Sequence, residues 1–331
     1  MINILLGVIL AFLISIFISP TIIKIMTRFK FGQPILNYVE EHKSKQGTPT
    51  IGGIIFIGGT IIATLLIFTG QAVFSILTLV VMLGYGILGF LDDYIKIKYK
   101  HNQGLRAYQK IIGQLGIATL VAFFAYNNTY IGSVVWIPFL NINFDIGIFI
   151  IPLIIFIFIA CTNSVNLTDG LDGLAGSVMQ VYLIAIITLS FILIPSSVNI
   201  QYIQEINNLR ITAGCLFGGI LGFLCFNAHP AKIFMGDTGS LALGAFIACF
   251  ATFTQTYLAI PFFGVMFVVS ALSDIIQVLH FKRTKKRVFL MAPYHHHLQK
   301  KGMYETKIVT IYITITMVIS MLFILAVMLT A

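Results

Sequence analysis

Charge is scarce in this 331-residue chain, where Asp, Glu, Lys and Arg together make up 9% of the residues and hydrophobic residues make up 58%. Soluble domains carry about 25% charged residues, so the scarcity excludes an ordinary soluble protein and indicates an integral membrane protein. A soluble-domain count cannot be read from the length of such a chain. We expect one continuous helical unit over residues 1–331.

Cysteine is also rare, and its four positions lie in apolar runs without metal-ligand or disulfide spacing. This pattern excludes a zinc site and a disulfide scaffold and favours small buried side chains. A basic segment is missing before the first apolar run, since the first lysine is Lys24. Residues 1–18 are therefore predicted to begin a membrane span rather than a signal peptide. The cysteines are Cys161, Cys215, Cys225 and Cys249.

Long apolar runs are what the chain does have. At about 20 apolar residues per crossing they predict an all-α, polytopic membrane protein with ten transmembrane helices. Because ten is even, both termini should lie on the same side. The predicted spans are 3–23, 51–69, 72–91, 111–126, 146–162, 174–194, 210–226, 240–257, 259–280 and 307–329.

The loop charges orient these spans. Of the 20 Lys and Arg residues, all except Arg210 fall in or beside the loops after spans 1, 3, 5, 7 and 9. Basic loops face the cytoplasm, so both termini are predicted to be outside. The net charge of +9 is thereby explained by topology, and we expect no nucleic-acid partner.

Five aspartates share the predicted cytoplasmic side with these cations, although the positive-inside rule does not require acids there. Carboxylates gathered with many cations near a membrane predict a site for a metal-bound anion. The five are Asp92, Asp93, Asp169, Asp172 and Asp237.

Asp92 and Asp93 end the third predicted span in GFLDDYIK. Adjacent helical residues point about 100° apart, so the two carboxylates are expected to do different jobs. Lys96 follows at helical spacing, and an ordinary salt bridge within the helix is the alternative reading.

The stretch NSVNLTDGLDGLA (163–175) places Asp169 and Asp172 on one face if it is helical, with Asn166 nearby. Helix capping by Thr168 or Asp169 is the alternative, but capping explains one polar residue and not four. We therefore favour a functional site at this stretch.

Asp237 lies in FMGDTGS, just before the eighth predicted span. A hard carboxylate beside a helix N-terminus could hold Mg²⁺ while backbone amides face phosphate oxygens, and a helix N-cap is the alternative. Phe234 could stack on a base or anchor the chain at the membrane surface. Thr50 could cap the second span.

His295, His296 and His297 follow a basic run. Three consecutive histidines cannot all ligate one metal from a regular helix, which argues against zinc. They could instead hydrogen-bond phosphates or carry protons. Topology and attraction to anionic lipids already explain the basic run.

Taken together, five stretches of the chain resemble the bacterial phospho-N-acetylmuramoyl-pentapeptide transferases, a branch of the polyprenyl-phosphate N-acetylhexosamine 1-phosphate transferase superfamily. The resemblance covers essentially the whole chain, and the triple histidine indicates the muramoyl-pentapeptide branch. The stretches, in the family's order, are KSKQGTPTIGG, GFLDDYIK, NSVNLTDGLDGLA, FNAHPAKIFMGDTGSLALG and APYHHHLQKKG.

The resemblance implies a single transmembrane transferase domain (1–331) in the bacterial plasma membrane, with a cytoplasmic active site. It implies Mg²⁺-dependent transfer of phospho-MurNAc-pentapeptide from UDP to undecaprenyl phosphate, which gives lipid I and UMP. This would be the first membrane step of peptidoglycan synthesis, on which cell-wall growth, cell shape and division depend. Family members are dimers and targets of nucleoside antibiotics.

The family's motifs also imply residue roles. Asp237 would be the principal Mg²⁺ ligand, and Asp92 would activate the acceptor phosphate with Asp93 beside it. His295, His296 and His297 would support catalysis. The substrate site would be formed by Lys45, Thr50, Asn166, Asp169, Gly170, Leu171, Asp172, Asn227 and Phe234.

One departure from the family concerns Ser270, where relatives often carry Glu, and Asp274, where they carry an apolar residue. The acid has moved one helical turn and could still serve the same groove. Two alternatives stay open: the same chemistry with UDP-N-acetylglucosamine as donor, and an ion-coupled transporter. Direct attack and a covalent phospho-enzyme both fit the sequence.

Overall fold

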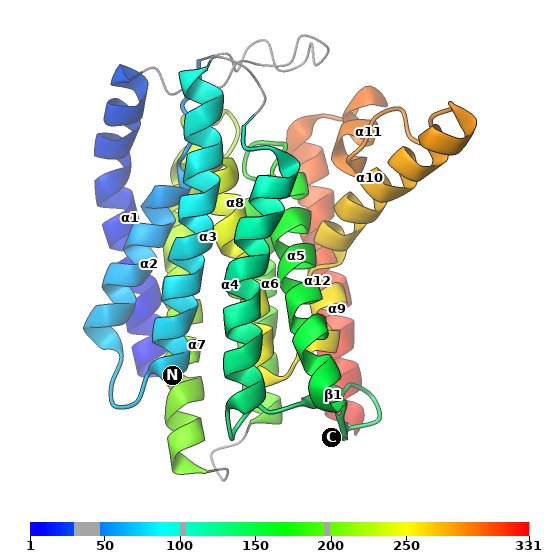
Figure 1. Ribbon diagram of the computed structural model, residues 1–331. Helices are drawn as coiled ribbons and strands as arrows, with labels where there is room; N and C mark the ends of the chain where they lie inside the picture. The colour runs from blue at the N-terminus through cyan, green and yellow to red at the C-terminus, as the bar shows by residue number, and fades with distance from the viewer. Residues whose placement is uncertain (30–46, 100–103, 195–198, 331) are drawn as a thin grey trace.

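The computed structural model describes residues 1–29, 47–99, 104–194 and 199–330 as a bundle of long helices with one small hairpin (Figure 1). The long elements are α1 (Ile2–Arg28), α2 (Gly53–Ile67), α3 (Val73–Lys98), α4 (Ala107–Asn127), α5 (Ile150–Thr168), α6 (Leu174–Leu193), α7 (Ile200–Asn227), α8 (Gly236–Thr254), α10 (Val265–Thr284) and α12 (Glu305–Thr330). The short helices are α9 (Ile260–Phe263) and α11 (Tyr294–Lys300).

Nine helices in the described ranges are long and apolar enough to cross a membrane, so the protein is a polytopic helical membrane protein. The remaining predicted span, 51–69, corresponds to α2, which has 15 residues. At 1.5 Å per residue, α2 is about 22 Å long, shorter than a bilayer core of about 30 Å. Both chain ends lie at the end of the bundle away from α11 (Figure 1).

Helix α8 forms the centre of the bundle and is buried along almost its whole length. It packs against α3, α5 and α2, while α7 packs against α1 and α2. Small residues permit these close contacts. A methyl group added at Gly53 of α2 would lie 2.3 Å from the Cα of Gly239 in α8, so no larger side chain fits there.

Three helix boundaries differ from the predicted spans, two of them at the site and one at the opposite end of the bundle. Helix α3 continues past residue 91 to Lys98, and α5 continues past residue 162 to Thr168. Helix α7 begins at Ile200 rather than at residue 210. In each case polar residues extend the helix beyond its apolar run, because neighbouring helices supply their partners.

The connection between α4 and α5 contains an antiparallel hairpin that the sequence reasoning missed. Strands β1 (Val134–Ile137) and β2 (Ile142–Asp145) pair with Val134 opposite Asp145. Each strand has only 4 residues, and every residue of β2 is exposed.

Candidate active site

Three of the predicted carboxylates meet where α3 and α8 come together. Asp92 and Asp93 lie in the last two turns of α3, and Asp237 lies in the first turn of α8. One carboxylate oxygen from each lies within 4.8 Å of the other two. Residues 144 positions apart are thus joined in one cluster.

The two adjacent aspartates point to different partners, as their helical spacing predicts. Asp93 is completely buried and accepts hydrogen bonds from the Thr238 amide (3.0 Å), the Thr238 hydroxyl (2.8 Å) and the Asp237 amide (3.2 Å). It therefore satisfies the free N–H groups at the start of α8. Asp92 pairs instead with Lys96 (2.5 Å) and accepts from the Leu105 amide (2.8 Å).

Asp237 is the point where four helices converge. Its Oδ2 atom accepts hydrogen bonds from the ammonium groups of Lys110 in α4 (2.6 Å) and Lys96 in α3 (3.2 Å). Its Oδ1 atom accepts from the Asn166 amide (2.7 Å) of α5. The side chain of Asp237 is 14% exposed, so the group remains accessible to a ligand.

Glycines make this convergence possible. A methyl group added at Gly89 of α3 would lie 2.1 Å from the carbonyl oxygen of Asp237. Gly236 has φ +72°, a conformation that favours glycine, and a methyl group there would lie 2.5 Å from Oδ2 of Asp93. Only glycine allows the backbone of α8 to start this close to the carboxylates.

The Asp169–Gly173 turn connects α5 to α6 beside this cluster. Asp169 is the C-cap residue of α5, and Gly173, with φ +73°, is the N-cap of α6. This segment is not helical, so the condition under which Asp169 and Asp172 would share a helical face is not met. The alternative of a Thr168 or Asp169 N-cap is wrong. The glycine-rich sequence favours a tight turn over a continuous helix.

Within this turn, Leu171 is buried and Asp172 is almost fully covered. Asn227 supports the turn from the end of α7. Its Oδ1 accepts from the Gly173 amide (3.1 Å), and its Nδ2 donates to the Ile233 carbonyl (2.9 Å). Asn227 thereby links the turn to the chain that leads into α8.

Asp169 is partly buried, and this burial, together with the negative charges of Asp237, Asp93 and Asp172, raises its pKa to about 8. At neutral pH the carboxyl group thus holds a proton and can donate a hydrogen bond as well as accept one.

The three histidines lie in α11 and take three different positions. His295 is buried against the turn, since a methyl group added at Gly170 would lie 2.2 Å from its Nε2. His296 bonds to Gln299 (2.8 Å). His297 accepts from the Leu290 amide (3.1 Å), and partial burial and the charge of Lys301 lower its pKa. Only His295 is brought against the Asp169–Gly173 turn by these contacts.

Thr50 and Phe234 come from two segments that pair through their backbones. The Phe234 amide donates to the Pro49 carbonyl (2.8 Å), and the Gly52 amide donates to the Phe234 carbonyl (2.8 Å). Thr50 does not cap α2, whose N-cap is Gly52. Its buried hydroxyl lies against Gly236 and has no hydrogen-bond partner among the described residues. Lys45 lies outside the described residues.

Asp274 lies half-buried on α10, one turn beyond Ser270, whose hydroxyl donates to the Met266 carbonyl (3.0 Å). Among the described residues, Asp274 belongs to neither group of metal-competent side chains. That Asp274 serves the same groove as the Glu that relatives often carry at position 270 stays a prediction.

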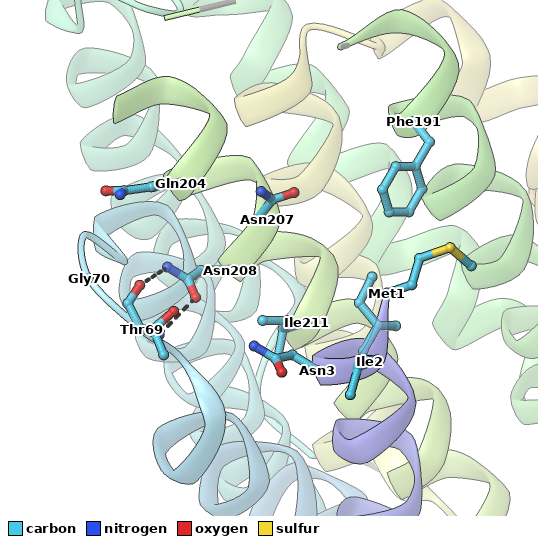
Figure 2. Close-up of a pocket in the computed structure, with 11 residues that line it drawn as sticks. Met1, Ile2, Asn3, Thr69, Gly70, Phe191, Gln204, Asn207, Asn208 and Ile211 are labelled. Carbon is cyan, nitrogen blue, oxygen red and sulfur yellow. Dashed lines mark hydrogen bonds between the residues drawn. The ribbon is translucent and has the colours of Figure 1, made fainter. Parts of the chain in front are cut away.

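A cavity of about 670 Å³ lies at the opposite end of the bundle (Figure 2). Four of the side chains that line the cavity carry amide groups: Asn3, Gln204, Asn207 and Asn208. None of its lining residues is acidic. The cavity therefore lacks the carboxylates and lysines of the α3–α8 end.

The carboxylate cluster fits a hard divalent cation. Three aspartates offer oxygen atoms, which are the ligands that Mg²⁺ prefers, and no thiol or imidazole belongs to the described group of Asp92, Asp93 and Asp237. The two lysines beside Asp237 supply positive charge for phosphate groups.

The chain is similar in sequence to known proteins. A model of glycosyl transferase family 4 matches residues 73–255, which contain all three aspartates. The phospho-N-acetylmuramoyl-pentapeptide-transferase of Clostridioides difficile (strain 630) is 43% identical over 319 residues, covering 96% of both chains. That of Clostridium novyi (strain NT) is 41% identical over 317 residues, covering 96% of this chain and 94% of the relative.

The chain belongs to the phospho-N-acetylmuramoyl-pentapeptide-transferase family. A third member, from Thermoanaerobacter sp. (strain X514), is 42% identical over 317 residues and covers 96% of both chains. The family assignment supports a transferase, since the family model describes glycosyl transferases.

Sequence reasoning gave no site role to Lys110, His229 and Glu305, and it treated Lys96 only as a helical ion pair. That pair is present, but Lys96 also reaches Asp237. Lys110 stands near the start of an apolar run, and an ionisable residue at such a position was the available signal.

Proposed function

We propose that this protein transfers phospho-MurNAc-pentapeptide from UDP-MurNAc-pentapeptide to undecaprenyl phosphate, giving lipid I and UMP. The observation that carries the proposal is the meeting of Asp92, Asp93 and Asp237 with Lys96 and Lys110 at one end of the bundle. The names of the relatives, which align over nearly the whole chain, support the choice of donor.

In the proposed reaction, an acceptor phosphate oxygen bonds to the phosphorus next to the sugar. The bond from that phosphorus to the bridging oxygen breaks, and UMP leaves with the electron pair. Enzymes that catalyse such transfers mainly position the reactants and offset spreading negative charge. A site at the end of a membrane bundle lets a soluble nucleotide meet a lipid-linked phosphate.

The contacts of each side chain suggest its role in this transfer. Asp237, with Asp92 beside it, would hold Mg²⁺, which when bound stabilises charge on the pyrophosphate. Lys110 and Lys96 offset the remaining phosphate charge. Asp93 fixes the start of α8 and so the position of Asp237.

Asp92 acts on the acceptor through Lys96, to which it is paired. Its value as a base is small, because an acceptor phosphate with a second pKa of about 6 is largely ionised at neutral pH. Asp169 would face the donor, whereas the Thr50 hydroxyl is buried against Gly236. We place the site on the cytoplasmic side of the plasma membrane with both termini outside, in agreement with the loop charges.

The test is UMP release by purified protein in detergent with undecaprenyl phosphate and Mg²⁺. UDP-MurNAc-pentapeptide and UDP-N-acetylglucosamine are supplied in separate reactions, and the lipid product is identified by mass spectrometry. We expect release with the first donor only. Release with only the second would overturn the donor assignment, and release with neither by folded protein would overturn the transferase proposal in favour of transport.

A further inference from the structure

The Asp169–Gly173 turn is tied to the last helix by Glu305. This residue lies in the first turn of α12, and its Oε1 atom accepts the backbone N–H of Asp172 at 2.6 Å. The two residues are 133 positions apart. A hydrogen bond from an N–H group to a carboxylate is stronger than one between neutral groups, and the Glu305 side chain is only 11% exposed.

The side chain of Asp172 is held as well. Its Oδ2 atom accepts the Ala231 amide at 3.0 Å and lies 3.1 Å from Nδ1 of His229. The same His229 nitrogen lies 3.7 Å from Oε2 of Glu305. His229 therefore stands between two carboxylates and joins the loop after α7 to both the turn and α12.

Two simpler explanations account for less. An acid in the first turn of a helix is favoured by the helix dipole, but that effect needs no partner outside the helix. Side chains of Asp172, His229 and Glu305 also approach closely enough for a cation. The backbone N–H groups of Asp172 and Ala231 are bonded to Glu305 and Asp172, and these bonds hold the turn whether or not a cation binds. The observed contacts are those of a brace.

We propose that Glu305 is a positioning residue for the turn that faces the nucleotide donor. By fixing the Asp172 backbone, Glu305 holds Asp169 and Gly170 at the distance from the carboxylate cluster that the donor requires. The ligand's identity rests on the proposed function, whereas the brace itself does not.

The first experiment measures the brace without any substrate. Amide hydrogen exchange is followed by mass spectrometry in the wild type, Glu305→Ala, Glu305→Gln and Tyr304→Ala. We expect faster exchange of residues 169–174 in Glu305→Ala, and a smaller increase in Glu305→Gln, whose amide oxygen can still accept the bond. Tyr304→Ala changes an 82% exposed neighbour and should leave the exchange unchanged. Unchanged exchange in Glu305→Ala would overturn the brace.

The second experiment tests positioning through kinetics. We expect Glu305→Ala to raise KM for the nucleotide donor about tenfold while kcat stays within about twofold, because a small displacement of a binding group weakens substrate binding. Glu305→Gln should recover most of the loss. An unchanged KM despite faster exchange would overturn the positioning role. A wild type that turns over no donor would refute the proposed function and leave the exchange result standing.

If Glu305→Ala does not purify as folded protein, Glu305→Gln and His229→Ala replace it. His229→Ala removes the contact to Asp172 from the opposite side of the brace. It should raise both the exchange of residues 169–174 and the donor KM, by less than Glu305→Ala is expected to. No change in either quantity in both variants would overturn the proposal.

Discussion

The two ends of the bundle both bury polar side chains but use them differently. At the end away from the candidate site, Asn208 donates to the carbonyl oxygens of Thr69 (2.8 Å) and Gln71 (2.7 Å), as Figure 2 shows for Thr69. Glu205 accepts the Phe74 amide at 2.9 Å. These side chains complete backbone hydrogen bonds where α2 ends and α3 begins.

At the other end, Asp93 also completes backbone hydrogen bonds, at the start of α8, but Asp237 is held by side chains. The carboxylate of Asp237 accepts hydrogen bonds from the side chains of Lys96, Lys110 and Asn166. No backbone group depends on these bonds for a partner. A ligand's phosphate or a cation can replace such contacts without opening a helix end. The comparison separates polar groups that hold the fold from those that are available for chemistry.

The largest expected effect is at Asp237. Asp237→Asn keeps the size of the side chain but removes the charge that would hold a cation, so kcat should fall by about 10²- to 10³-fold or more. UMP release by folded variant protein measures this. Turnover by Asp237→Asn at the wild-type rate would show that Asp237 is not the metal ligand. It would also contradict the difference between the two ends of the bundle.

Close packing around the site gives the next prediction. Gly89→Ala should destabilise the protein by about 1–3 kcal/mol and lower turnover, since the carbonyl of Asp237 must move. Gly58→Ala is the matched control, because a methyl group at Gly58 meets nothing within 4 Å. Thermal unfolding and UMP release are measured for both variants, and equal behaviour would contradict the contact.

Asn208 tests the opposite end. Asn208→Ala removes the part-buried side-chain donor to the Thr69 and Gln71 carbonyl groups of the α2–α3 connection, so stability should fall by about 0.5–1.5 kcal/mol. Turnover at a temperature where the variant is folded should stay within about twofold. A loss of kcat as large as that of Asp237→Asn would show that the two ends do not differ in the way argued above.

The last prediction concerns the direction in which stability changes with pH, and it rests on Asp169. Its pKa is raised to about 8 in the folded protein, against a usual value near 4. Between about pH 4 and pH 8 the unfolded chain releases this proton and the folded chain keeps it, so the wild type loses stability as pH rises. Asp169→Asn has no carboxyl group to titrate and does not lose stability in this way. The unfolding temperature of the variant minus that of the wild type should therefore increase from about pH 5 to about pH 8. Parallel pH curves would contradict the raised pKa.

The apolar runs were sufficient to predict most helices, because burial of about 20 apolar residues dominates a membrane segment. They could not predict that α3 reaches Lys98 or that α5 reaches Thr168. Those extensions depend on partners far along the chain, such as Asp237 for Lys96 and Asn166. The β1–β2 hairpin was missed because two strands of 4 residues give a weak signal.

The site was predicted where its residues form compact motifs. Asp92, Asp93 and Asp237 are brought together as the motifs indicated, and His295 reaches the Asp169–Gly173 turn. Lys110 could not be placed, because its contact with Asp237 spans 127 residues and depends on how α4 packs. Glu305 was missed for the same reason.

The most direct test of the central claim is metal removal from the wild type. UMP release from UDP-MurNAc-pentapeptide and undecaprenyl phosphate is measured before chelation, after chelation, and after Mg²⁺ is restored. The carboxylate cluster predicts that chelation stops the release, that Mg²⁺ restores it, and that the protein stays folded throughout. Undiminished release by chelated, folded protein would contradict the assignment of this end of the bundle as a Mg²⁺-dependent transferase site.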